Sequence, residues 1–163
     1  EVNESDASAP LLPLPDYYVA LLHKRLLGTR VLKMTSSASN VRAYAHCARS
    51  PSKGVAIAFL NIALNVTATV TPPPQLRSAT ARREFYLLSA GAPIAGAKNA
   101  LQSREVKLNG VALALVPGAS ASSAATLPPI VGQNESAAGT FDLPPSTYGF
   151  VHFPDARIPA CAE

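Results

Sequence analysis

The spacing of apolar residues changes at Gly28, from a helical repeat to a two-residue repeat. Before Gly28, one helical face collects apolar residues at positions 18, 19, 22 and 26. Pro15 and Asp16 are typical of a first helical turn, and the last turns are basic, with His23, Lys24 and Arg25. Gly28 itself suits a C-terminal cap. The pattern predicts one helix over residues 15–28, and a linker or leading loop over residues 1–14.

Beyond Gly28 the pattern favours short strands. Residues 41–47 alternate between two faces, whereas residues 54–61 are apolar at nearly every position, which predicts burial on both faces. The Asn109-Gly110 pair predicts a hairpin, and the short link at 62–64 predicts another. Residues 117–144 have the composition of a long loop. Strands are expected at 29–34, 41–47, 54–61, 65–71, 83–88, 105–108, 111–116 and 146–153.

About eight strands after one helix indicate an all-β fold, an antiparallel β-sandwich, with a barrel as the alternative. The length of 163 residues fits one domain and is too short for a (β/α)₈ barrel, which typically takes about 250 residues. A membrane-spanning helix takes about 20 apolar residues, and the longest apolar run, 55–64, contains Asn61. No transmembrane span is predicted.

The net charge is +4, from 14 basic and 10 acidic residues. The basic residues come in small groups without interleaved aromatic residues, which does not favour nucleic-acid binding. The first residues lack the basic and apolar regions of a signal peptide. Secretion would therefore require processing or a longer precursor.

Catalytic motifs are not recognised. His46 and Cys47 are neighbours in a strand and point to opposite faces, so they do not form a nucleophile–base pair. Glycoside hydrolysis needs two carboxylates about 5–10 Å apart, and nothing in the pattern pairs the acidic residues outside the N-terminal tail: Asp16, Glu84, Glu105, Glu135, Asp142, Asp155 and Glu163. Glu84 and Glu105 are expected at outward strand positions. The sequence predicts no catalytic residue, cofactor or metal site in this chain.

Two cysteines, Cys47 and Cys161, stand 114 positions apart, either as buried thiols or as one long-range disulfide. Three N-x-[ST] sequons begin at Asn3, Asn65 and Asn134. A disulfide together with three sequons would favour the secretory route.

Several segments carry a resemblance to a known family, in the same order as in that family. They are 14–18 with 27–32, 42–48, 60–61 with 65–67, 83–87, 106–110, 127–129, and 150–154 with 158–161. From about residue 12 to residue 161, the chain resembles glycoside hydrolase family 79, the endo-β-glucuronidases that include heparanase and plant heparanase-like proteins.

Members of this family join a (β/α)₈ barrel to a C-terminal β-sandwich. The resemblance implies that residues 15–28 are the last barrel helix and that residues 29–163 are the sandwich. The two glutamates of the family's retaining mechanism lie in the barrel, and no position here matches them, so the chain alone is expected to be inactive. The family's sandwich disulfide carries over to Cys47 and Cys161. Its glycosylation site carries over to Asn65 only.

The missing barrel is the expected partner. The family's sandwich also takes a segment from before the barrel, so the isolated chain should have an open sheet edge and an uncovered helix face, and should aggregate. Acidic polysaccharide is a second candidate partner, through Lys24, Arg25, Arg82 and Arg83. The expected location is extracellular, cell wall, or lysosome or vacuole, and peripheral association with a membrane stays open.

Two rival interpretations remain. The chain could be a free-standing, non-catalytic β-sandwich that binds acidic glycans or a protein. It could also be a truncated gene product.

Overall fold

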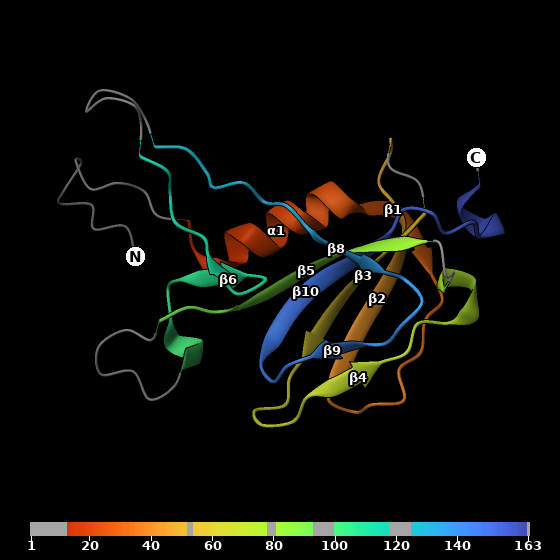
Figure 1. Ribbon diagram of the computed structural model, residues 1–163, viewed down its shortest axis with the longest axis horizontal. Helices are drawn as coiled ribbons and strands as arrows, with labels where there is room; N and C mark the ends of the chain where they lie inside the picture. Colours follow the sequence, from red (N-terminus) through yellow and green to blue (C-terminus); the bar gives the residue numbers. More distant parts are fainter. Residues whose placement is uncertain (1–12, 52–53, 78–80, 93–99, 118–124, 163) are drawn as a thin grey trace.

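The computed structural model describes residues 13–51, 54–77, 81–92, 100–117 and 125–162. One α-helix and ten strands follow each other in this part of the chain (Figure 1). They are α1 (Pro15–Leu26), β1 (Leu27–Leu32), β2 (Val41–Ala48), β3 (Val55–Asn61), β4 (Ala68–Val70), β5 (Arg82–Ala90), β6 (Val106–Leu108), β7 (Val111–Ala112), β8 (Gln133–Ser136), β9 (Phe141–Leu143) and β10 (Thr147–Phe153). Short 3₁₀ helices are η1 (Pro74–Leu76), η2 (Ala100–Gln102) and η3 (Pro159–Cys161).

Eight strands form one antiparallel sheet in the order β1-β2-β3-β10-β5-β6-β7, with β8 beside β5. One edge of β5 pairs with β10, and the other pairs with β8 at Arg82–Phe85 and with β6 at Leu88–Ala90. The two remaining strands, β4 and β9, form a small second sheet. Helix α1 lies on one side of the large sheet and β4–β9 on the other (Figure 1). The predicted all-β, sandwich-like fold is confirmed.

Strand β3 shows why both faces of the large sheet are apolar. Val55, Ile57 and Phe59 enter the core under β4–β9, while Ala56 and Ala58 face α1. Successive strand residues point to opposite faces, so a strand covered on both sides is apolar at every position. Only Leu60 within β3 is more than slightly exposed. The predicted burial of residues 54–61 on both faces is confirmed.

The apolar face of α1 packs on this sheet. Tyr18 and Leu22 are each 2% exposed and lie in the cluster that contains Ala56 and Ala58. Burying one such side chain stabilises the fold by about 1.5–3 kcal/mol. The expectation of an uncovered helix face is therefore wrong for these residues, because the sheet itself covers them. No helix in the described part of the chain is long and apolar enough to cross a membrane.

The helix ends earlier than predicted. Its last residue is Leu26, Leu27 already has extended backbone angles, and Gly28 lies in β1. Gly28 is therefore a strand residue and not a cap. A Cβ there would lie 2.7 Å from the carbonyl oxygen of Cys47. The glycine permits β1 to approach β2 closely.

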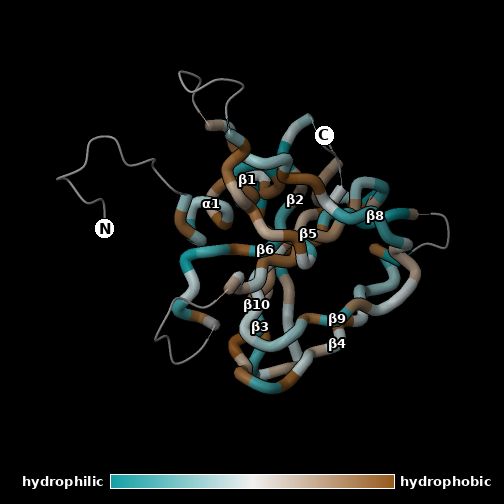
Figure 2. The backbone as a smooth tube through the Cα atoms, turned by 60° about the vertical axis from the view of Figure 1, so that its left-hand side comes forward, coloured by the Kyte–Doolittle hydropathy of each residue, from teal (hydrophilic) through white to brown (hydrophobic). Residues whose placement is uncertain are grey.

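Two predictions about the connections are also wrong. The link at 62–64 does not form a hairpin, because β4 pairs with β9 rather than with β3. The expected loop at 117–144 contains β8 and β9. Strand β8 reads Gln-Asn-Glu-Ser and is hydrophilic (Figure 2), so no apolar alternation marks it as a strand. By contrast, the Asn109-Gly110 hairpin is confirmed between β6 and β7.

Candidate functional site

A row of polar side chains crosses the α1 face of the large sheet. His46 on β2, His152 on β10 and Glu84 on β5 share one register row, with Ala56 of β3 between the two histidines. His152 is 4% exposed, and its Nδ1 lies 3.2 Å from Glu84 Oε2. His46 Nδ1 lies 2.8 Å from the carbonyl oxygen of Gly28. Glu84 is thus half-buried against the α1 layer rather than an outward strand position.

The same carboxylate accepts a hydrogen bond from Tyr86, whose hydroxyl lies 3.3 Å from Glu84 Oε2. Burial, and then the negative charge and hydrogen bond of Glu84, raise the pKa of Tyr86 to about 12. The phenol therefore stays neutral and remains a hydrogen-bond donor at physiological pH. One carboxylate held by a histidine and a neutral phenol makes a polar cluster that ties β5 to β10.

Glu135 lies on the strand next to Glu84 but on the other face of the sheet. Glu84 is paired in register with Asn134, and Arg83 with Glu135, so the two glutamates point in opposite directions. They cannot flank one glycosidic bond. In the part of the chain that the structure describes, no group of three or more His, Cys, Asp or Glu residues is arranged to hold a metal ion.

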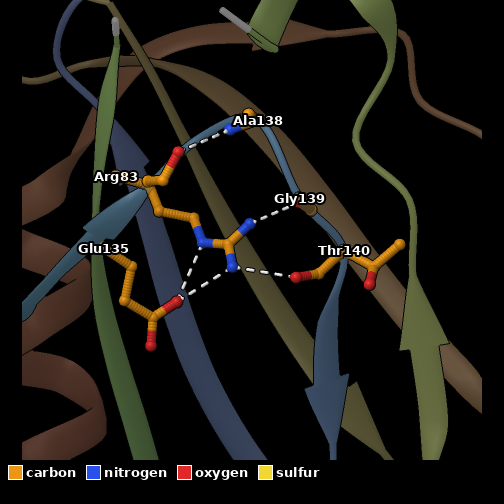
Figure 3. A network of polar contacts seen from close by, with 6 residues as sticks. Arg83, Glu135, Ala138, Gly139 and Thr140 are labelled. Carbon is orange, nitrogen blue, oxygen red and sulfur yellow. Dashed lines mark hydrogen bonds and ion pairs between the residues drawn. The ribbon is translucent and has the colours of Figure 1, made fainter. Parts of the chain in front are cut away.

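Arg83 forms a buried polar network with Glu135 (Figure 3). Arg83 is 5% exposed, and its Nε and Nη2 donate to Glu135 Oε2 at 3.0 and 2.9 Å. It also donates to the carbonyl oxygens of Gly139 at 2.7 Å and Thr140 at 2.9 Å, and it lies 4.9 Å from the centre of the Phe141 ring. The network joins β5, β8 and the turn into β9.

The four cations proposed as glycan contacts are therefore separated. Lys24 and Arg25 are exposed near the end of α1, and Arg82 is exposed at the start of β5, on the same face as Glu84 and Tyr86. Arg83 points to the opposite face and its guanidinium is fully engaged, so it is not available to a polyanion. Alternation along β5 places the two neighbours on opposite faces, but the sequence does not reveal that Arg83 binds Glu135, 52 positions away.

Arg49 is a cation near Lys24 that sequence reasoning missed. Its Nη1 donates to the carbonyl oxygen of Lys24 at 2.9 Å, and its backbone nitrogen donates to Leu26. The two cations are 25 positions apart. Only the fold, which brings the end of β2 to the end of α1, could reveal this grouping.

The disulfide and the sequon asparagines lie at different places in the structure. Cys47 of β2 and Cys161 of η3 form the predicted disulfide, with Cα atoms 5.4 Å apart. Asn65 is exposed in the β3–β4 connection, and Asn134 is exposed on β8. Asn3 lies outside the described residues.

An open groove of about 750 Å³ runs between the two sheets. Its floor includes Ile57 and Phe59 of β3, and its walls come from the β1–β2 connection and from β4 and η1. The wall residues include Leu32, Met34, Val70 and Leu76. Sequence reasoning did not locate this groove, because its floor and walls come from segments that are far apart in the sequence.

Known proteins similar to this chain are several times longer. No protein-family model matches the chain. It is 36% identical over 157 residues to heparanase of Gallus gallus, which covers 91% of this chain and 27% of that protein. It is 34% identical over 153 residues to baicalin-beta-D-glucuronidase of Scutellaria baicalensis, which covers 93% of the chain and 26% of that protein. For heparanase-like protein 3 of Arabidopsis thaliana the identity is 30% over 170 residues, with 92% and 30% covered.

The chain thus spans between a quarter and a third of the length of these relatives. The resemblance to heparanase and heparanase-like proteins, predicted from ordered sequence segments, is confirmed.

Proposed function

We propose that this chain is the C-terminal β-sandwich portion of a heparanase-like glycoside hydrolase whose catalytic barrel is encoded upstream. The observation that carries the proposal is the coverage: about nine-tenths of the chain, but only about a quarter of the Gallus gallus heparanase, is aligned. The whole enzyme would hydrolyse β-glucuronosyl linkages with retention, using two glutamates. The geometry supports their location outside this chain, because Glu84 and Glu135 lie on opposite faces of the sheet.

Helix α1 would connect the sandwich to that barrel. One side of the helix contributes Tyr18 and Leu22 to the sheet, while Leu14 and Tyr17 at its start remain 44% and 42% exposed. These residues leave an exposed apolar surface at the first turn of the helix, which a further layer would cover. We assign that layer to the barrel.

The groove between the sheets would receive a segment of chain from before the barrel, as the family resemblance implies. Strand β4 pairs only with β9 among the described strands, so its other edge is free to bind an extended segment. Leu32, Met34 and Val70 line the groove beside it. Without upstream chain the 163-residue portion is expected to aggregate.

The protein would follow the secretory route to the extracellular space, cell wall, lysosome or vacuole, with Asn65 as the glycosylated residue. The Cys47–Cys161 disulfide supports this proposal, because such bonds persist in oxidising compartments.

A free-standing module that binds acidic glycans is the second candidate. The observation that favours it is the exposure of Lys24 and Arg25 near the end of α1, where the exposed Arg49 donates to the Lys24 carbonyl oxygen. Arg82 is a further exposed cation, at the start of β5. Binding through these exposed cations should weaken with salt, because exposed charges are screened.

The test is to recover the native protein with an antibody to this segment, measure its mass, and assay cleavage of β-glucuronides. We expect a mass larger by a barrel, roughly 250 residues, and activity that the 163-residue chain alone lacks. A native mass near 16.9 kDa, allowing for glycans and with no co-purifying subunit, would contradict the enzyme proposal in favour of the binding module.

A further inference from the structure

The connection between β3 and β4 presents three apolar side chains to solvent around one asparagine. Ile62 is 50% exposed, Leu64 is 77% exposed and Val66 is 53% exposed. Leu64 and Val66 are the chain neighbours of Asn65, and consecutive Cα atoms are only about 3.8 Å apart. Single exposed apolar residues are ordinary, but three of them within five positions point to a group that covers them.

The loop is held in this exposed arrangement by Asn61, the last residue of β3, which is fully buried. Its side-chain nitrogen donates to the carbonyl oxygens of Val66 at 2.8 Å and Leu143 at 2.9 Å, and its side-chain oxygen accepts from the backbone nitrogen of Ala63 at 3.0 Å. A further bond from Ser146 holds the carbonyl oxygen of Ala63 at 2.8 Å.

These bonds anchor the loop at residues 61, 63 and 66. Turning the apolar side chains inward would break these hydrogen bonds. Each broken bond would leave a polar group without a partner, and the lost free energy disfavours the change.

The occupant we assign to this surface is a glycan on Asn65. Asn65 and Thr67 are both exposed and form the sequon Asn-Val-Thr. Its first sugar would begin between Leu64 and Val66, the two exposed chain neighbours of Asn65. An N-acetylglucosamine offers a methyl group and C–H faces that can contact aliphatic side chains, while its hydroxyls stay in water.

We propose that an N-linked glycan on Asn65 covers the apolar side chains of residues 62–66, and that the same loop without its glycan is a self-association site. The inference rests on the proposed secretory route. The modification joins the Asn65 side-chain nitrogen to the anomeric carbon of an oligosaccharide donated by a lipid diphosphate. The amide loses one proton, the carbon–oxygen bond to the diphosphate breaks, and the lipid diphosphate leaves with the electron pair.

Asn134 provides the matched control. It is also an exposed sequon residue, but its neighbours on β8 are Gln133 and Glu135, which are polar. A glycan there has no apolar neighbours of this kind to cover. Removing it should leave the surface apolarity of the protein unchanged.

The experiment uses the full protein secreted from eukaryotic cells, with glycopeptide mass spectrometry to measure occupancy of Asn65. Asn65→Gln and Asn134→Gln are compared by light scattering after size exclusion and by fluorescence of an apolar-surface dye. Glycosidase trimming to a single N-acetylglucosamine tests whether the first sugar suffices. We expect Asn65→Gln to lose monomer and to gain severalfold in dye fluorescence. The trimmed protein and Asn134→Gln should behave as the wild type.

A rescue variant distinguishes exposed surface from misfolding. Adding Leu64→Ser and Val66→Thr to Asn65→Gln should restore the monomer, with thermal unfolding by circular dichroism as the check that each variant folds. An unmodified Asn65 overturns the proposal. So does an Asn65→Gln protein that behaves as Asn134→Gln does, or one that the two polar substitutions do not rescue. Glucuronidase activity and native mass, measured separately, decide the proposed enzyme function independently.

Discussion

Removing the Arg83 side chain tests whether the buried network organises the second sheet. From β5, the guanidinium donates side-chain hydrogen bonds to Glu135 and to the carbonyl oxygens of Gly139 and Thr140. In an Arg83→Met variant the aliphatic stem can still pack on Phe141, but these acceptors lose their donor. Breaking a buried pair by removing one partner typically costs about 3–5 kcal/mol. Since the Glu135 side chain is 29% exposed, it can partly rehydrate, so we expect a loss of about 3 kcal/mol.

Urea unfolding of the oxidised protein measures this loss. Arg82→Met is the matched control, because Arg82 is the exposed neighbour on the same strand, and its effect should stay within about 0.5 kcal/mol. The double variant Arg83→Met/Glu135→Gln should recover part of the loss, since the unpaired buried charge is gone. An Arg83→Met protein within about 1 kcal/mol of the wild type would refute the assignment, because it would place the pair among weak surface pairs.

Three further predictions follow from individual contacts. The pKa of Tyr86 is about 12, against an ordinary value of 10.0, so the unfolded state loses this proton at a lower pH than the folded state does. Stability should therefore fall as pH rises from about 10 to 12. A pH series of urea midpoints should show a shallower fall in Tyr86→Phe than in the wild type, and an equal fall would contradict the assignment. Replacing Cys47 and Cys161 by serine should cost roughly 4–5 kcal/mol, as for a loop of about 100 residues, in the same unfolding assay; no shift in midpoint would count against the bond. Gly28→Ala should destabilise the protein by about 1–3 kcal/mol, because its Cβ would overlap the backbone of β2. A variant that unfolds at the same temperature as the wild type would contradict this, because it would mean that the backbone shifts to make room.

Local sequence patterns predicted the elements whose structure depends on their own residues and immediate neighbours. Residues 54–61 are apolar throughout because β3 is buried on both faces, and the Asn109-Gly110 turn adopts positive φ at both residues, as its hairpin requires. Both features depend on the residues in place and their immediate neighbours. The sequence is therefore a sufficient guide to them.

The incorrect predictions concern residues whose structure depends on distant partners. Gly28 looks like a helix cap, but the close approach of β2 decides its role. The hydrophilic β8 is a strand because it pairs with β5 and because Glu135 binds Arg83, contacts that join residues 52 positions apart. Likewise, Asn61 directs the chain from β3 toward β9 through bonds to Leu143. No periodicity in a single sequence can reveal such pairings.

The two sides of the large sheet differ in how completely this chain covers them, and the difference bears on the proposed enzyme. On one side, α1 closes over the small side chains of Ala56 and Ala58 and still exposes apolar residues at its own start. On the other, the two-stranded β4–β9 sheet leaves a groove of about 750 Å³ over Phe59. A barrel beyond α1 would cover the first surface, and a segment of upstream chain would fill the second. If the proposed barrel and upstream segment cover these surfaces, a protein that contains both should be more stable than the 163-residue chain by more than either contact alone provides.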